Sequence, residues 1–125
     1  MRSALLVEDS PTIRLELIPT LAELADVVVV GVAETEREAI AWLTTHPHTA
    51  ELVVLDLFLR EGSGLGVLAQ WARLPDRTRV VVLTNYATDE MRRRCEALGA
   101  EAVFDKSGEL DAFFAHCRGQ APTLH

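Results

Sequence analysis

Short apolar runs recur five times along the chain, at residues 4–7, 27–33, 52–55, 80–83 and 102–104. They are rich in valine and leucine, and polar residues do not alternate within them. Runs of this kind are typical of strands that are buried on both faces of a parallel sheet. Segments with apolar residues at helical spacing separate the runs. The order strand then helix, repeated five times, predicts an α/β fold with helices on both faces of a parallel sheet.

Helix start signals stand shortly after the apolar runs end. Ser10 followed by Pro11 predicts an N-cap and a first helical position. Pro19 lies inside the same predicted helix, so we expect a kink or a lost hydrogen bond there. Further helix starts are predicted at the capping box that begins with Thr35, at Thr88 and at Ser107, and a helix end at Gly99.

Composition indicates one soluble domain. The 125 residues are 49% apolar and 25% charged, which is ordinary for a globular protein. We expect a single domain over residues 1–125, with its core at about 2–118. The net charge of −7 argues against a general nucleic-acid binder. Cys95 and Cys117 do not have metal-ligand spacing and are interpreted as small, partly buried thiols kept reduced.

Signals for export and membrane insertion are lacking in the sequence. The N-terminal residues do not contain the apolar stretch of a signal peptide. The longest apolar run, at residues 27–33, is far shorter than the about 20 residues that a membrane span needs. We therefore expect a cytoplasmic protein that does not associate with a membrane.

Polar residues occupy the carboxyl ends of four predicted strands, where ligands of open α/β sheets bind. They are Glu8 and Asp9 after the first strand, Asp56 after the third, Thr84 after the fourth and Lys106 after the fifth. Three carboxylates converging on one edge would repel one another, and a hard divalent cation such as Mg²⁺ relieves that repulsion. Lys106 is the single lysine of the chain and would add a positive charge opposite Asp56.

Each of these residues can also be explained without a functional role, because strands commonly end where the chain reaches solvent and polar residues are common there. Threonine is common in strands, so Thr84 needs no special role, and Glu8 and Asp9 could form a solvated strand end. Asp56 is different, since it stands among apolar residues and therefore needs a reason to be there. The joint arrangement on four strand ends favours a metal and phosphate site over an explanation without a functional role.

The motifs at these ends are similar to those of the receiver domain of two-component response regulators. They are Val7-Glu8-Asp9-Ser10, Leu55-Asp56, Leu83-Thr84-Asn85, Asp105-Lys106-Ser107 and the loop from Gly62 to Gly64. The resemblance covers about residues 2–118. It implies a flavodoxin-like fold of five βα units in three layers, with strand order 2-1-3-4-5.

The resemblance also implies the role of each site residue. Asp56 would take a phosphoryl group from the phosphohistidine of a sensor histidine kinase or a phosphotransfer protein. Thr84 would hydrogen-bond one phosphoryl oxygen, and Lys106 would pair with another. The resemblance assigns the Mg²⁺ ligands to Glu8, Asp9, Asp56 and the backbone carbonyl of Phe58.

The expected output is protein contact rather than enzymatic turnover of a substrate. The new charge on Asp56 would bias the face formed by the fourth helix, the fifth strand and the fifth helix. An unknown downstream protein, or a second copy of the chain, would bind that face. We expect a stand-alone receiver, without direct contact to nucleic acid.

The sequence departs from the family pattern after the fifth strand. Val103 stands where an aromatic switch residue is usual, and Phe104 follows one position later, so alternation places its ring on the opposite face. Ser107 stands where proline usually follows the lysine.

Two aromatic residues stand close to the predicted site. Phe58 and Tyr86, two residues beyond Asp56 and Thr84, would crowd the path of hydrolytic water. They predict a slowly decaying phosphoryl group.

Other interpretations remain open from the sequence. Arg92, Arg93 and Arg94 form either a solvated helix face paired with Glu90 and Glu96 or part of a partner surface. The chain could be a pseudo-receiver, which binds partners without phosphorylation. It could also be a small Mg²⁺-dependent phosphatase. Against the phosphatase, the two residues that follow Asp56 include no second acid to donate a proton.

Overall fold

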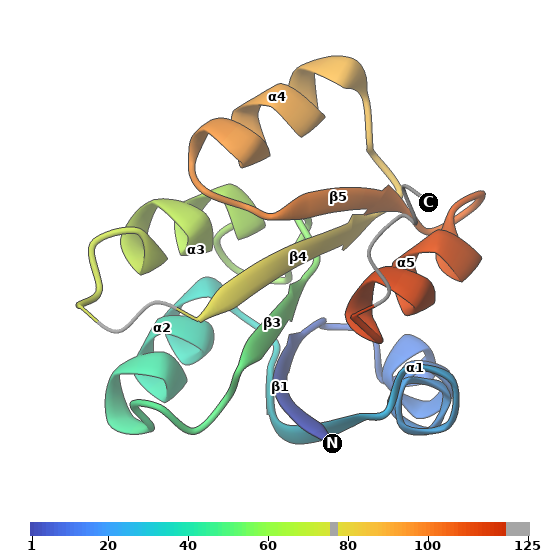
Figure 1. The fold of residues 1–125 in the computed structure, drawn as a ribbon. Helices are drawn as coiled ribbons and strands as arrows, with labels where there is room; N and C mark the ends of the chain where they lie inside the picture. The colour runs from blue at the N-terminus through green and yellow to red at the C-terminus, as the bar shows by residue number, and fades with distance from the viewer. Residues whose placement is uncertain (76–77, 120–125) are drawn as a thin grey trace.

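The computed structural model describes residues 1–75 and 78–119, and within them the chain forms a parallel five-stranded sheet between two layers of helices (Figure 1). The strands are β1 (Arg2–Val7), β2 (Val27–Ala33), β3 (Leu52–Leu55), β4 (Arg79–Thr84) and β5 (Ala102–Asp105). The helices are α1 (Pro11–Ala25), α2 (Glu36–Thr45), α3 (Gly64–Trp71), α4 (Asp89–Ala97) and α5 (Leu110–Cys117). The strand order β2-β1-β3-β4-β5 confirms the predicted flavodoxin-like α/β fold.

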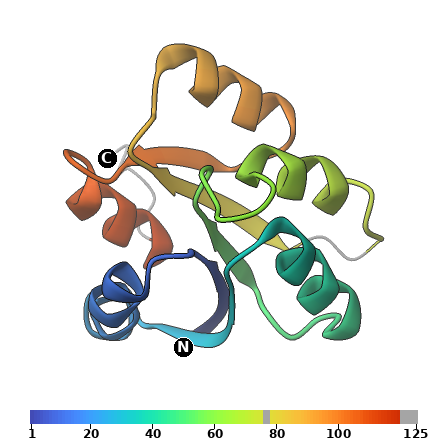
Figure 2. The same ribbon diagram turned by 180° about the vertical axis from the view of Figure 1, so that it is seen from behind.

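Two hydrophobic clusters pack on opposite faces of the sheet, because successive strand residues point to opposite sides. Leu5 and Val7 of β1 belong to the cluster under α2, α3 and α4. Ala4 and Leu6 belong to the cluster under α1 and α5. Figures 1 and 2 show the same division of the helices between the two sides of the sheet. Non-alternating apolar runs are therefore what the central strands require.

The side chains of Val103 and Phe104 in β5 point to opposite faces of the sheet, as predicted. Val103 is buried in the cluster that contains Cys95 of α4. Phe104 packs against the other cluster, with its ring centroid 6.0 Å from that of Phe113. The prediction that Phe104 lies on the opposite face from Val103 is confirmed.

The predicted starts of α1, α2 and α4 are confirmed by N-cap hydrogen bonds. The hydroxyl groups of Ser10, Thr35 and Thr88 accept from the amides three residues further on. Gly99 follows α4 with a φ of 107°, as expected for a residue just past a helix end. Helix α1 continues through Pro19, whose missing N–H removes one helical hydrogen bond without ending the helix.

The predicted start of the last helix at Ser107 is wrong. Helix α5 begins at Leu110, and its N-cap position is Glu109. The amide of Ser107 instead donates to the carboxylate of Asp105 at 2.6 Å, which closes a turn directly after β5. This turn delays the helix by two residues relative to the prediction.

The two thiols are buried more completely than predicted, Cys95 on the core-facing side of α4 and Cys117 at the end of α5. Burial raises the pKa of Cys117 to about 12, so this thiol stays protonated and unreactive at neutral pH. Among the described residues, the helices are too short or too polar to cross a membrane.

Candidate functional site

The predicted acidic residues meet at the carboxyl edge of the sheet. Strands β1 and β3 are neighbours, and the amide of Asp56 donates to the carbonyl of Val7 at 3.0 Å. This pairing brings Asp56 beside Glu8, which follows Val7 directly. One carboxylate oxygen from each of Glu8, Asp9 and Asp56 lies within 4.8 Å of the others. The expected convergence of the three carboxylates is therefore found in the structure.

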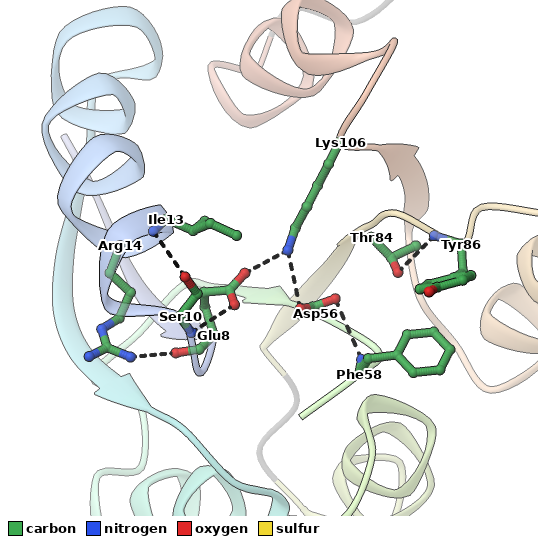
Figure 3. Close-up of polar contacts among 9 residues, drawn as sticks. All are labelled: Glu8, Ser10, Ile13, Arg14, Asp56, Phe58, Thr84, Tyr86 and Lys106. Atoms are coloured by element: carbon green, nitrogen blue, oxygen red, sulfur yellow. Dashed lines mark hydrogen bonds and ion pairs between the residues drawn. The ribbon is translucent and has the colours of Figure 1, made fainter. Parts of the chain in front are cut away.

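Lys106 reaches across this cluster from the end of β5 (Figure 3). Its Nζ atom lies 2.7 Å from Glu8 Oε1 and 3.1 Å from Asp56 Oδ2. Its backbone amide donates to the carbonyl of Thr84 at 2.9 Å, so the end of β5 is tied to the end of β4. The expected position of Lys106 opposite Asp56 is confirmed, and its contact with Glu8 is additional.

Burial and ion pairing act in opposite directions on the pKa values of this pair, and burial prevails only at Glu8. Burial raises the pKa of Glu8, although hydrogen bonds from Lys106 and from the amide of Ser10 work in the opposite direction. Burial by itself would lower the pKa of Lys106, but the hydrogen bond to Glu8 and the charges of both acids outweigh it. The pKa of Lys106 therefore lies above its ordinary value, and the lysine stays charged.

The donor set fits a divalent cation. Three carboxylates and one ammonium leave an excess of two negative charges at the site. All three candidate ligands offer hard oxygen atoms, which Mg²⁺ prefers. Lys106 occupies one side of the cluster and neutralises only part of its charge. Glu8, Asp9 and Asp56 are thus suited to hold Mg²⁺.

Thr84, Phe58 and Tyr86 lie on the side of Asp56 that faces away from Glu8 (Figure 3). Thr84 is fully buried, and its hydroxyl accepts from the amide of Tyr86 at 3.2 Å. The rings of Phe58 and Tyr86 contact each other with centroids 4.3 Å apart. The structure brings together every side chain predicted for the site.

Arg14 belongs to the same edge of the sheet, and the sequence interpretation missed it. Its Nη1 atom donates to the carbonyl of Glu8 at 2.8 Å and lies 2.8 Å from Glu34 Oε2. Arg14 stands one helical turn after the N-cap Ser10, which would have been the only local signal. These contacts hold the backbone of the β1–α1 loop, which carries the acidic pair.

The chain belongs to the response regulator receiver domain family, which matches residues 4–118. It is 33% identical to the acid tolerance regulatory protein ActR of Rhizobium meliloti over 112 residues, covering 90% of this chain and 56% of ActR. The chain spans about half the length of the curated relatives it matches. The resemblance inferred from the motifs is confirmed.

Solved structures of receiver domains share the fold. One is the signal receiver domain of a DNA-binding response regulator from Colwellia psychrerythraea 34H, with a TM-score of 0.81 and 24% identity, covering 95% of this chain and 97% of that one. Another is the phosphorylated cyanobacterial phytochrome response regulator RcpA, with a TM-score of 0.71 and 25% identity, covering 94% and 89%. These structures show that the fold is shared, and the family match identifies the chain as a response regulator receiver domain of two-component systems.

Proposed function

We propose that Asp56 accepts a phosphoryl group from the phosphohistidine of a sensor histidine kinase or a phosphotransfer protein. The observation that carries this proposal is the bridge from Lys106 to Asp56 and Glu8 within a cluster of three carboxylates. This cluster combines the carboxylate of Asp56, which would be the nucleophile, with the fixed ammonium group of Lys106 and with a set of oxygen atoms that would bind a metal cation. These are the parts that phosphoryl transfer needs.

The transfer exchanges one bond for another. A carboxylate oxygen of Asp56 attacks the phosphorus, the P–N bond to the histidine breaks, and the electron pair stays on the imidazole nitrogen. The product is an acyl phosphate, which is labile enough to serve as a reversible signal. Charge spreads over the three equatorial oxygens during transfer, and donors already in place stabilise it. Lys106 would donate to one of these oxygens, and the hydroxyl of Thr84 to another.

Mg²⁺ would be held by Glu8, Asp9 and Asp56, with the carbonyl of Phe58 as a further ligand. When bound, it neutralises charge on the transferring phosphoryl group. Glu8 and Asp9 keep their carboxylates at the edge of the cluster, and Arg14 holds the backbone of their loop through the Glu8 carbonyl. The ligand set therefore depends on residues that the fold has already positioned.

The phosphorylated state would signal through protein contact on the face formed by α4, β5 and α5. The bound partner would be a downstream protein or a second copy of the chain. Phe58 and Tyr86 would slow the loss of the signal, because their contacting rings lie next to Asp56 and restrict the approach of water. This arrangement favours a long-lived acyl phosphate.

The decisive experiment is phosphorylation by a small donor. Acetyl phosphate is added with Mg²⁺, while intact mass and the fluorescence of Trp42 and Trp71 are followed. We expect a gain of one phosphoryl group that requires Mg²⁺, disappears with a chelator and is absent in Asp56→Asn. If neither mass gain nor a fluorescence response to Mg²⁺ is seen in the unaltered chain, the chain is a pseudo-receiver.

A further inference from the structure

The guanidinium group of Arg92 joins three separate parts of the fold. From α4, its Nε donates to the carbonyl of Ala87 at 3.0 Å, and its Nη1 donates to the carbonyl of Val103 at 2.8 Å. Its Nη2 donates to the carboxylate of Glu109 at 2.7 Å. The interpretation that this arginine pairs with Glu90 or Glu96 on a solvated helix face is wrong, because the side chain turns toward β5 and the start of α5.

The first of these contacts leads back to Thr84. The amide of Tyr86 donates to the Thr84 hydroxyl, and Ala87 is the next residue along the chain. A hydroxyl oxygen can accept from this amide while its proton is donated elsewhere. If Thr84 donates its proton to a phosphoryl oxygen on Asp56, Tyr86 and Ala87 move together with it.

The third contact leads to Lys106. The carboxylate oxygen of Glu109 that pairs with Arg92 also accepts from the amide of Asp105 at 2.9 Å. The amide of Glu109 donates in return to the carbonyl of Asp105, also at 2.9 Å. Lys106 follows Asp105 directly. Arg92 is thus connected to both residues that would contact the phosphoryl group.

The position usually taken by an aromatic switch cannot perform that role here. Val103 is buried, with a side chain that is too small to swing between an inner and an outer position. The backbone carbonyl of Val103, by contrast, is engaged by Arg92. Arg92 of α4 therefore connects the backbone of β5 at Val103 to the β4–α4 loop at Ala87, in place of an aromatic switch residue.

We propose that Arg92 is the positioning residue that transmits the state of Asp56 to β5 and to the start of α5. This inference rests on the proposed phosphorylation of Asp56. Movement of Thr84 toward the phosphoryl group displaces the Ala87 carbonyl, and Arg92 passes the displacement to Val103 and Glu109. A charged side chain with several donors can bridge three acceptors at once, which an aromatic ring cannot do.

The test is hydrogen–deuterium exchange of residues 105–117, with and without acetyl phosphate and Mg²⁺, after intact mass has shown the extent of phosphorylation. The variant is Arg92→Gln, and the matched control is Arg93→Gln, which alters an exposed arginine of the same helix. We expect the unaltered chain and the control to change exchange in 105–117 on phosphorylation. Arg92→Gln should gain the phosphoryl group and lose that change.

Arg92→Lys serves as a second variant if Arg92→Gln does not fold, as judged by exchange in β1 and β3. Its ammonium keeps the charge but cannot contact three acceptors in the same geometry, so the exchange response should be weakened. Absence of mass gain in the unaltered chain overturns the proposed function and this relay together. A phosphorylated Arg92→Gln or Arg92→Lys with the full exchange response overturns the relay alone, as does a phosphorylated unaltered chain without any response.

Discussion

The Nζ atom of Lys106 lies 3.1 Å from Asp56 Oδ2, although fifty residues separate the two along the chain. The same atom also contacts Glu8, whose side chain is only 3% exposed. Lys106 is therefore the countercharge of two buried acids. Its presence explains how the acidic cluster is tolerated before any metal binds.

Replacing Lys106 should destabilise the fold in a way that Mg²⁺ partly reverses. Lys106→Met leaves Glu8 and Asp56 without their partner, and breaking a buried pair in this way costs about 3 kcal/mol of unfolding free energy. The measurement is urea unfolding with a chelator and with Mg²⁺. The gain from Mg²⁺ should be larger than in the unaltered chain, since the competing ammonium is gone.

The control for this prediction is the double variant Glu8→Gln with Lys106→Met. It removes one of the two acids that lost their partner and should recover part of the lost stability. Equal urea midpoints for the unaltered chain and Lys106→Met in chelator would contradict the structural role assigned to the lysine.

Gly64 should tolerate no side chain, because of its closeness to Asp56. A Cβ atom at Gly64 would lie 2.3 Å from the carbonyl oxygen of Asp56. This oxygen is a backbone atom, so the overlap could be relieved only by moving the backbone. We expect Gly64→Ala to lower the free energy of unfolding by about 2 kcal/mol, and to reduce Mg²⁺-dependent phosphorylation by displacing Asp56. Gly108→Ala is the control, since a Cβ there would have no atom of the described residues within 4 Å.

The two glycine variants are compared by thermal or urea unfolding and by intact mass after treatment with acetyl phosphate. Gly108→Ala should stay within about 0.5 kcal/mol of the unaltered chain. Similar losses in both variants would show that helix propensity or chain entropy, and not the contact with Asp56, governs the effect.

The aromatic pair should control how long the signal lasts. Tyr86→Ala removes one of two contacting rings beside Asp56 and opens a path for water. The half-life of the acyl phosphate, followed by intact mass after removal of the donor, should become several-fold shorter. Leu24→Ala, an exposed apolar residue of α1, is the control and should leave the half-life unchanged. An unchanged half-life in Tyr86→Ala would refute the shielding role.

Acid should weaken an ion pair at the opposite end of the sheet. Glu101 accepts from Arg79 Nε at 2.7 Å and contacts His116 Nε2 at 2.5 Å. The hydrogen bond from Arg79, opposed by burial and helped by His116, lowers the pKa of Glu101 to about 2. A lowered pKa contributes stability above the ordinary value near 4.5, and this contribution is lost as the pH falls toward 2.

The check is Glu101→Gln, unfolded by urea at pH 6 and at pH 2.5. At pH 6 the variant should be less stable by about 1 kcal/mol, a modest value because the pair is partly exposed and screened by solvent. At pH 2.5 the difference should shrink. A difference that stays constant between the two pH values would show that the charge of Glu101 contributes nothing.

Local patterns in the sequence were sufficient for the succession of strands and helices and for the polar residues at the strand ends. The order of the strands in the sheet came from the resemblance to receiver domains, and Arg14 was missed. Apolar runs predict buried strands because period and burial are properties of consecutive residues. The N-caps at Ser10 and Thr88 act within one helical turn, so they too can be read locally. Once the strands are assigned, the topology of a parallel sheet brings their carboxyl ends together, and Glu8, Asp56 and Lys106 must meet there.

Only the tertiary structure decided which residues contact one another away from those strand ends. Arg92 turns toward Glu109 instead of Glu90 or Glu96 because α4 packs against β5 next to the start of α5. The spacing of apolar residues predicts which face of α4 lies on the sheet, but not which charged groups of other elements lie beside that face. The late start of α5 depends on a turn held by Asp105. Contacts of this kind depend on how separate elements pack, and packing involves residues that are distant in the chain.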